Sequence, residues 1–179
     1  MSPSGDSALL LTTLLDYFQG EKIEALVFIL PVGLASLTFG AWLLVDNPTA
    51  FTRGIAIPFV LMGLLMGTVG AVVGYRAPAQ VKALQTAVVA SDAPALKTEL
   101  ARMQTVNKAW PRYLLLWAAF GLGGLALRFV FGSAFLQGLG AALVFFAGVG
   151  LLVDGFAERR THAYTAALED SVSKAAAGP

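Results

Sequence analysis

Few side chains in this sequence are of the types that carry catalysis or hold a metal. The chain has no cysteine and one histidine, His162, which follows Arg159 and Arg160 on a polar segment. Thiol chemistry and cysteine-ligated metals are therefore excluded, and one imidazole without further ligands does not make a metal site. We expect no catalytic group, no metal and no cofactor, and we interpret His162 as a solvated surface residue.

Two polar residues, Arg128 and Gln137, lie within long apolar stretches, and Asp154 stands at the end of the last stretch. An ionisable group inside a membrane is a functional candidate by default. Arg128 and Asp154 are both near the end of an apolar stretch, so snorkelling of the side chain to the interface explains them more simply. No carboxylate is expected near the midplane of a bilayer, where proton-coupled transport usually needs one.

Basic side chains outside the apolar stretches form a second group of candidates. Lys97 and Arg102 lie in the polar segment 76–112, and Arg159 and Arg160 lie in the last segment. We expect these four charges to be exposed and to contact another protein, or the anionic head groups of membrane lipids. The net charge of +1 gives no indication of a nucleic-acid surface.

The composition indicates a polytopic membrane protein. Hydrophobic residues make up 57% of the chain and charged residues 13%, whereas a soluble domain carries about 25% charge. The mean hydropathy is +0.73. The apolar residues gather in four stretches, each about long enough to cross a bilayer as a helix: 25–45, 54–75, 113–131 and 134–153. We predict an all-α fold in which four transmembrane helices form two tandem hairpins, packed as a four-helix bundle, with cytoplasmic helical extensions.

The prediction divides the chain into five segments. The first is an amphipathic helix in the membrane interface, ended by Gly20, with Ala8, Leu11, Leu15 and Phe18 on its apolar face; a helix packed on the bundle is the alternative. The polar segments are expected to be helices with a break at residues 91–94 and three narrow apolar stripes: Val81, Leu84 and Val88; Leu96, Leu100 and Met103; Tyr164, Leu168 and Val172. The segments are 1–23 (interfacial helix), 24–75 (first transmembrane hairpin), 76–112 (helical hairpin), 113–153 (second transmembrane hairpin) and 154–179 (C-terminal helix and tail).

The distribution of basic residues predicts the orientation. Of the twelve Lys and Arg residues, only Arg53 and Arg128 fall on the side of the two short connections within the hairpins. All the others fall on the side of the N-terminus, the segment 76–112 and the C-terminal tail. Because cytoplasmic loops are enriched in Lys and Arg, we expect both termini in the cytoplasm, with the protein in a bacterial inner membrane.

Small residues recur along the apolar stretches at helical spacing and predict close helix packing. This packing either holds the spans of one chain together or joins two copies in a homo-oligomer. The two halves of the chain also match weakly: Phe39-Gly40 aligns with Phe120-Gly121, as expected either from duplication or from chance in glycine-rich stretches. The packing candidates are Gly33, Ser36, Gly40, Gly63, Gly67, Gly70, Gly74, Gly148 and Gly155.

Three classes of function remain open from the sequence. The favoured hypothesis is a non-enzymatic membrane protein that acts by protein–protein interaction, as a membrane immunity factor or an accessory subunit of a membrane complex. The alternative is an oligomeric channel or small-solute transporter. An enzyme acting on lipid ranks last, because the sequence offers no nucleophile or metal site for it.

Overall fold

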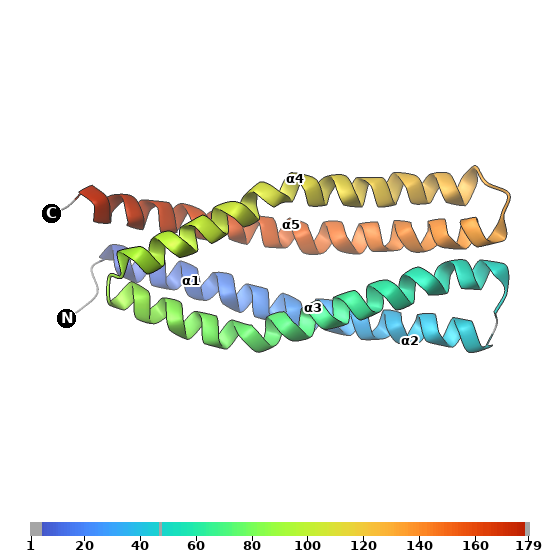
Figure 1. The fold of residues 1–179 in the computed structure, drawn as a ribbon, viewed down its shortest axis with the longest axis horizontal. Helices are drawn as coiled ribbons and strands as arrows, with labels where there is room; N and C mark the ends of the chain where they lie inside the picture. The colour runs from blue at the N-terminus through green and yellow to red at the C-terminus, as the bar shows by residue number, and fades with distance from the viewer. Residues whose placement is uncertain (1–4, 47, 178–179) are drawn as a thin grey trace. The chain divides into compact units, whose positions relative to one another are not determined.

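The computed structural model describes residues 5–46 and 48–177, and the regular elements in this part of the chain are all helical. Residues 1–4, 47 and 178–179 lie outside it, and with them the ends of the predicted segments 1–23 and 154–179. In chain order the elements are α1 (Gly5–Ile23), a π-helical turn η1 (Glu24–Ile29), α2 (Leu30–Asp46), α3 (Ala50–Val89), α4 (Ala93–Phe129) and α5 (Ala134–Ala177). Figure 1 traces this order from blue to red. The prediction of an all-α fold is confirmed.

The helix that begins with α1 does not end at Gly20, as the sequence pattern had predicted, but continues through η1 into α2. Gly20 has a different role, because a Cβ at this position would lie 2.6 Å from Cδ of Arg160. It therefore lets α5 come close to α1 instead of capping the helix. The π-helical turn ends two residues before Pro31, whose ring would clash with the backbone four residues earlier in a regular α-helix.

Three helices are long and apolar enough to cross a membrane: Ser7–Asp46, Ala50–Val89 and Ala134–Ala175. The predicted fourth span, residues 113–131, belongs to α4, which is not among them. Arg112 and Arg128 bound its uncharged stretch, and α4 ends at Phe129. This stretch is shorter than the about 20 residues that a spanning helix usually has.

The connection between α3 and α4 has the expected break at residues 91–94. Asp92 caps α4, because its Oδ1 accepts a hydrogen bond of 3.1 Å from the backbone N–H of Ala95. Ser91, just before it, takes a left-handed conformation with φ of 54° as α3 ends. The two long helices thus reverse direction in a tight turn.

The chain forms two compact units, each made of segments that are distant in the sequence. Unit 1 contains residues 1–23, 73–110 and 155–179, and unit 2 contains residues 24–72 and 111–154. The boundaries fall close to those of the predicted polar and apolar segments. The helices α3, α4 and α5 each contribute residues to both units.

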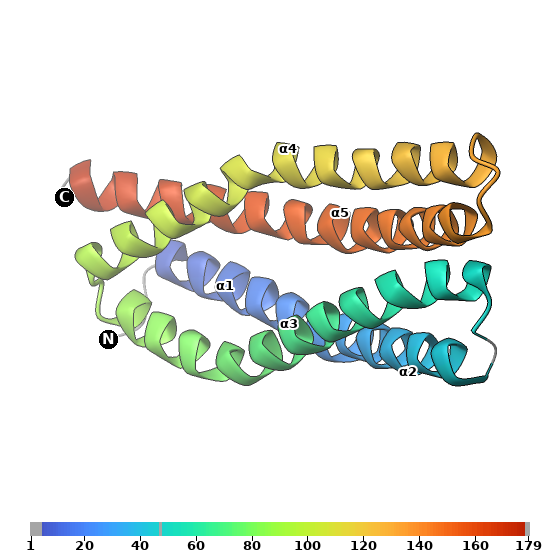
Figure 2. The same cartoon turned by 45° about the vertical axis from the view of Figure 1, so that its right-hand side comes forward.

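Unit 1 has a hydrophobic core of its own, to which α1 and the polar parts of α3, α4 and α5 all contribute. The ribbons of these helices can be followed in Figure 2. The three predicted stripes meet in it: Val88, Leu96, Met103, Tyr164 and Leu168 are buried, and Val81, Leu84, Leu100 and Val172 pack against them. The predicted apolar face of α1 is wrong in part. The buried residues of α1 are Leu10, Leu14, Tyr17 and Phe18, whereas Ala8 and Leu15 are exposed.

Helix packing in unit 2 depends on glycines that bring two backbones together. A Cβ on Gly33 would collide with the backbone N of Gly67, and one on Gly70 would lie 2.8 Å from the backbone N of Leu30. A Cβ on Gly63 would likewise collide with the backbone N of Leu37. Such close contacts are possible only because glycine has no side chain. The helix α2 and the first half of α3 therefore pack as closely as their backbones permit. Gly40, whose Cβ would meet Ala56 and Val60, extends this contact. Ser36 of α2 is also buried, and so is Gly74 in the part of α3 that belongs to unit 1.

The remaining predicted packing glycines have room for a side chain, although the backbone of Gly67 is what Gly33 approaches. An added Cβ would meet nothing within 4 Å at Gly67, Gly148 or Gly155, and the last two are exposed. In α5 the close contacts are made by other glycines. Gly138 faces the carbonyl oxygen of Phe51, Gly140 faces that of Gly124, and Gly150 faces the ring of Trp117.

Candidate functional site

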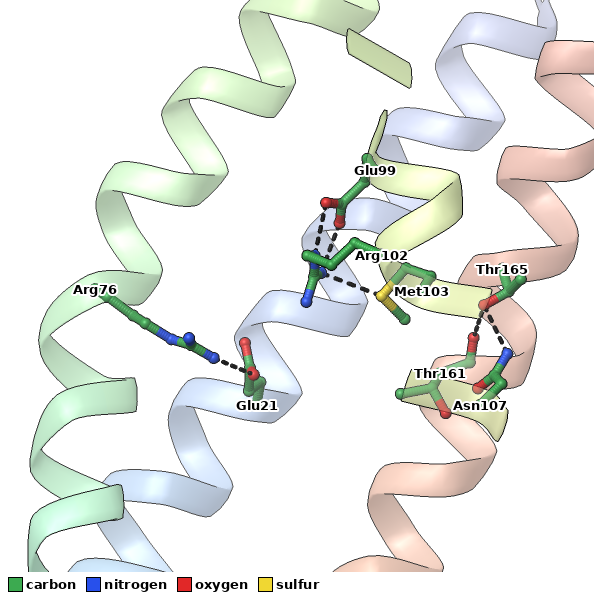
Figure 3. Close-up of polar contacts among 8 residues, drawn as sticks. All are labelled: Glu21, Arg76, Glu99, Arg102, Met103, Asn107, Thr161 and Thr165. Atoms are coloured by element: carbon green, nitrogen blue, oxygen red, sulfur yellow. Dashed lines mark hydrogen bonds and ion pairs between the residues drawn. The ribbon is translucent and has the colours of Figure 1, made fainter. Parts of the chain in front are cut away.

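The most polar site inside unit 1 is an ion pair between Glu99 and Arg102, one turn apart on α4 (Figure 3). Nε of Arg102 donates to Oε2 of Glu99 at 2.8 Å, and Nη2 donates to Oε1 at 2.7 Å. The Glu99 side chain is only 7% exposed, and that of Arg102 is 35% exposed. A buried carboxylate requires such a partner, because an unpaired charge in the core would cost several kcal/mol.

Two tyrosine rings, Tyr17 of α1 and Tyr164 of α5, stack beside this pair with centroids 4.9 Å apart. Burial raises the pKa of both tyrosines above the ordinary value of 10.0; the negative charge of Glu21 raises that of Tyr17 further, and that of Glu99 does the same for Tyr164. The hydrogen bond to Glu99 raises the pKa of Arg102. Both tyrosines therefore stay neutral while the arginine stays charged. We name Tyr17, Glu99, Arg102 and Tyr164 the ion-pair cluster.

A second polar network joins α4 to α5 within unit 1 (Figure 3). Nδ2 of Asn107 donates to Oγ1 of Thr165 at 2.9 Å, and the indole N–H of Trp110 donates to Oγ1 of Thr161 at 3.0 Å. Thr161 and Thr165 are both buried. Buried hydroxyl groups must find such partners, so the network fixes how the two helices align.

The four basic residues predicted to meet a partner divide into two pairs. Lys97 and Arg159 are exposed. Arg102 belongs to the ion-pair cluster, and the side chain of Arg160 packs against Gly20 of α1. Glu99 was not among the residues predicted from the sequence, although its spacing to Arg102 matches a helical ion pair. A further ion pair joins unit 1 at 3.6 Å, between Arg76 of α3 and Glu21 of α1.

The two polar residues of the apolar stretches, Arg128 and Gln137, come together in unit 2. Nη1 of Arg128 lies 3.5 Å from Oε1 of Gln137, and Nε2 of Gln137 donates to the carbonyl oxygen of Phe131 at 3.1 Å. The guanidinium also lies 6.0 Å from the ring centroid of Phe51. These contacts are close to the turn between α4 and α5, so Arg128 has a local role there.

These ion pairs and hydrogen bonds serve to align the helices. Within the described part of the chain, no group of three or more His, Asp or Glu side chains is placed to hold a metal ion. Comparison with known proteins finds no matching protein-family profile, no matching curated protein and no matching solved structure. The function must therefore be argued from the geometry of this chain.

Proposed function

We propose that this is an integral membrane protein with four spanning helices, whose unit 1 lies in the cytoplasm with both termini and binds another protein. The observation that carries the proposal is the shared core of unit 1, to which α1, the middle segment and the C-terminal tail all contribute. Segments that share a core must lie on one side of a membrane. The chain therefore crosses an even number of times between any two of them.

This condition supports a fourth span. Between unit-1 residues 23 and 73 the chain runs through α2 and the apolar part of α3, which makes two crossings. Between residues 110 and 155 it runs through α4 and α5. If α5 crosses, the apolar part of α4 must cross too, although it is short. A short span can tilt little, and Arg128 near its end can snorkel to the interface.

The orientation follows from the charges. Only Arg53 and Arg128, of the twelve Lys and Arg residues, lie near the two short connections of the hairpins; the other ten fall on the opposite side, and the side richer in basic residues faces the cytoplasm. A bacterial inner membrane is the setting that we propose. The protein would act there without catalysis, as an immunity factor against a membrane-active toxin or as an accessory subunit of a membrane complex.

The binding surface that we propose is the exposed surface of unit 1, with Lys97 of α4 and Arg159 of α5 as its candidate contact residues. The stripes of unit 1 bury one another, so the surface that remains for a partner is charged and already ordered. Electrostatic complementarity would then set the choice of partner and the rate of association. A partner with acidic side chains opposite Lys97 and Arg159 fits this proposal.

The test is the double charge reversal Lys97→Glu with Arg159→Glu. Exposed charges contribute little to stability, so the variant should fold and insert as wild type does. Arg102 and Arg160 must be left unchanged, because reversing Arg102 would place a second negative charge beside Glu99. Lys22→Glu with Lys82→Glu, which also changes the net charge by four units at exposed positions of unit 1, is the matched control for net charge.

Proteins that co-purify from the native membrane would be compared between these variants. Loss of a specific partner from the Lys97→Glu/Arg159→Glu variant, but not from the Lys22→Glu/Lys82→Glu control, supports the proposal. An identical set of partners for all three proteins contradicts it.

A further inference from the structure

Unit 2 contains a pocket that the proposed function does not use. It has a volume of about 200 Å³ and lies between α3 and α5, with Ile29 and Trp117 completing its wall. The residues from α3 are Met62, Leu65, Met66 and Val69, which share one helical face. Leu65 and Val69 are 56% and 41% exposed, so the pocket opens to the surface on this face.

One carboxylate, that of Asp154, stands in this otherwise apolar wall. Its Oδ2 accepts a hydrogen bond of 2.5 Å from the indole N–H of Trp117. Gly150, one turn before Asp154, allows the indole ring to lie directly against α5, because a Cβ at Gly150 would collide with the ring. The backbone of α5 thus places the indole and the carboxylate side by side.

These groups together define a ligand chemistry. Methionine and aliphatic side chains accept an alkyl chain, while a carboxylate next to an indole is suited to a positive charge. Indole is the best aromatic partner for a cation, and ammonium groups are bound by aromatic rings in this way.

We propose that this pocket binds a small amphiphilic cation, with its alkyl chain among Met62, Met66 and Val69 and its ammonium group beside Asp154 and Trp117. The charge complementarity selects a cation over a neutral or anionic molecule of the same shape. The volume is smaller than the about 300–1,000 Å³ of typical drug-sized sites, so a short-chain ligand is expected.

Equilibrium binding of radiolabelled hexyltrimethylammonium to the purified full-length protein in maltoside micelles tests this proposal. The micelles carry no cationic group that would compete. We expect saturable binding to wild type that excess unlabelled cation displaces, and that neither hexanol nor hexyl sulfate displaces at the same concentration. Asp154→Asn should weaken binding about tenfold or more, since the close charge pair is lost. Asp46→Asn, which removes an exposed carboxylate elsewhere in unit 2, should bind as wild type does.

A second variant protects the test against a folding defect in Asp154→Asn. Val69→Trp fills the mouth of the pocket at a half-exposed position and should also abolish binding, although it leaves the carboxylate in place. Absence of saturable binding to wild type, or equal affinity of wild type and Asp154→Asn, would overturn the proposal. Displacement by an equal concentration of a short-chain phosphatidylcholine would assign the pocket to a lipid head group and would overturn it as well.

Discussion

The contact between Gly33 and Gly67 permits a matched test of helix packing in unit 2. Gly33 of α2 points at the backbone of Gly67 of α3, whereas Gly67 does not point back at Gly33. A Cβ on Gly33 would collide with the backbone of Gly67 and lie 2.9 Å from the carbonyl carbon of Met66, whereas one on Gly67 would meet nothing within 4 Å. The same methyl group is therefore added at a closed and at an open position of one interface.

The expected magnitudes follow from two terms. Replacing Gly by Ala in a helix favours folding by up to about 1 kcal/mol at either position. At Gly33 the overpacking costs about 1–3 kcal/mol in addition, because the atoms in the way belong to the backbone and cannot rotate aside. Gly33→Ala should therefore be less stable than Gly67→Ala by about 1–3 kcal/mol, a difference in which the helix propensity cancels.

The assay is the free energy of unfolding of each variant, measured by circular dichroism in mixed micelles of maltoside and dodecyl sulfate. Wild type should fall between the two variants or match Gly67→Ala. If Gly33→Ala were as stable as Gly67→Ala, then α2 and α3 would not pack through this glycine contact.

Two further predictions concern the ion-pair cluster. Arg102→Ala leaves Glu99 buried without its partner and should lower the free energy of unfolding by about 2–3 kcal/mol, less than for a fully buried pair because Arg102 is partly exposed; Arg159→Ala, at an exposed site, should change it by less than about 0.5 kcal/mol. The tyrosines should make unit 1 sensitive to alkali. Since the pKa of Tyr17 and Tyr164 is raised above 10.0 on folding, their contribution is complete below pH 10 and is lost as the pH rises further.

Both predictions can be checked by thermal unfolding. Equal melting temperatures for Arg102→Ala and Arg159→Ala would show that the ion pair contributes nothing. The loss of stability above pH 10 should be smaller in Tyr17→Phe, which cannot ionise at this position. An unchanged alkaline loss in that variant would contradict the assignment to Tyr17.

The apolar stripes of the polar segments were predictable because each of these segments contains few hydrophobic residues. Val81, Leu84 and Val88 have only one helical face in common, so periodicity identifies the buried side. In α1 the leucines are spread around the helix, and Leu15 and Leu14 both look suitable for a core. Contacts with other segments decide between them, and these are not visible in the local sequence.

The sequence also could not separate the two kinds of glycine or the two kinds of arginine. Gly33 and Gly67 have the same spacing pattern, and only the register of α2 against α3 determines which of them touches backbone. Arg102 and Arg159 both appear as surface charges, but the fold buries Glu99 and so engages Arg102. The candidates Lys97 and Arg159 remain as the sequence placed them, on the surface of unit 1.

The central claim is that the middle segment and the C-terminal tail lie on the same side of a membrane, which requires α4 to cross it. Because the chain has no cysteine, single-cysteine variants give an unambiguous answer. Ala90→Cys, Ala163→Cys and Gly132→Cys lie at exposed positions in the turn after α3, in the tail and in the connection between α4 and α5. With a membrane-impermeant maleimide, Gly132→Cys should be labelled in intact cells, and the other two only after the membrane is permeabilised. Labelling of Ala90→Cys and Ala163→Cys from opposite sides would contradict the account.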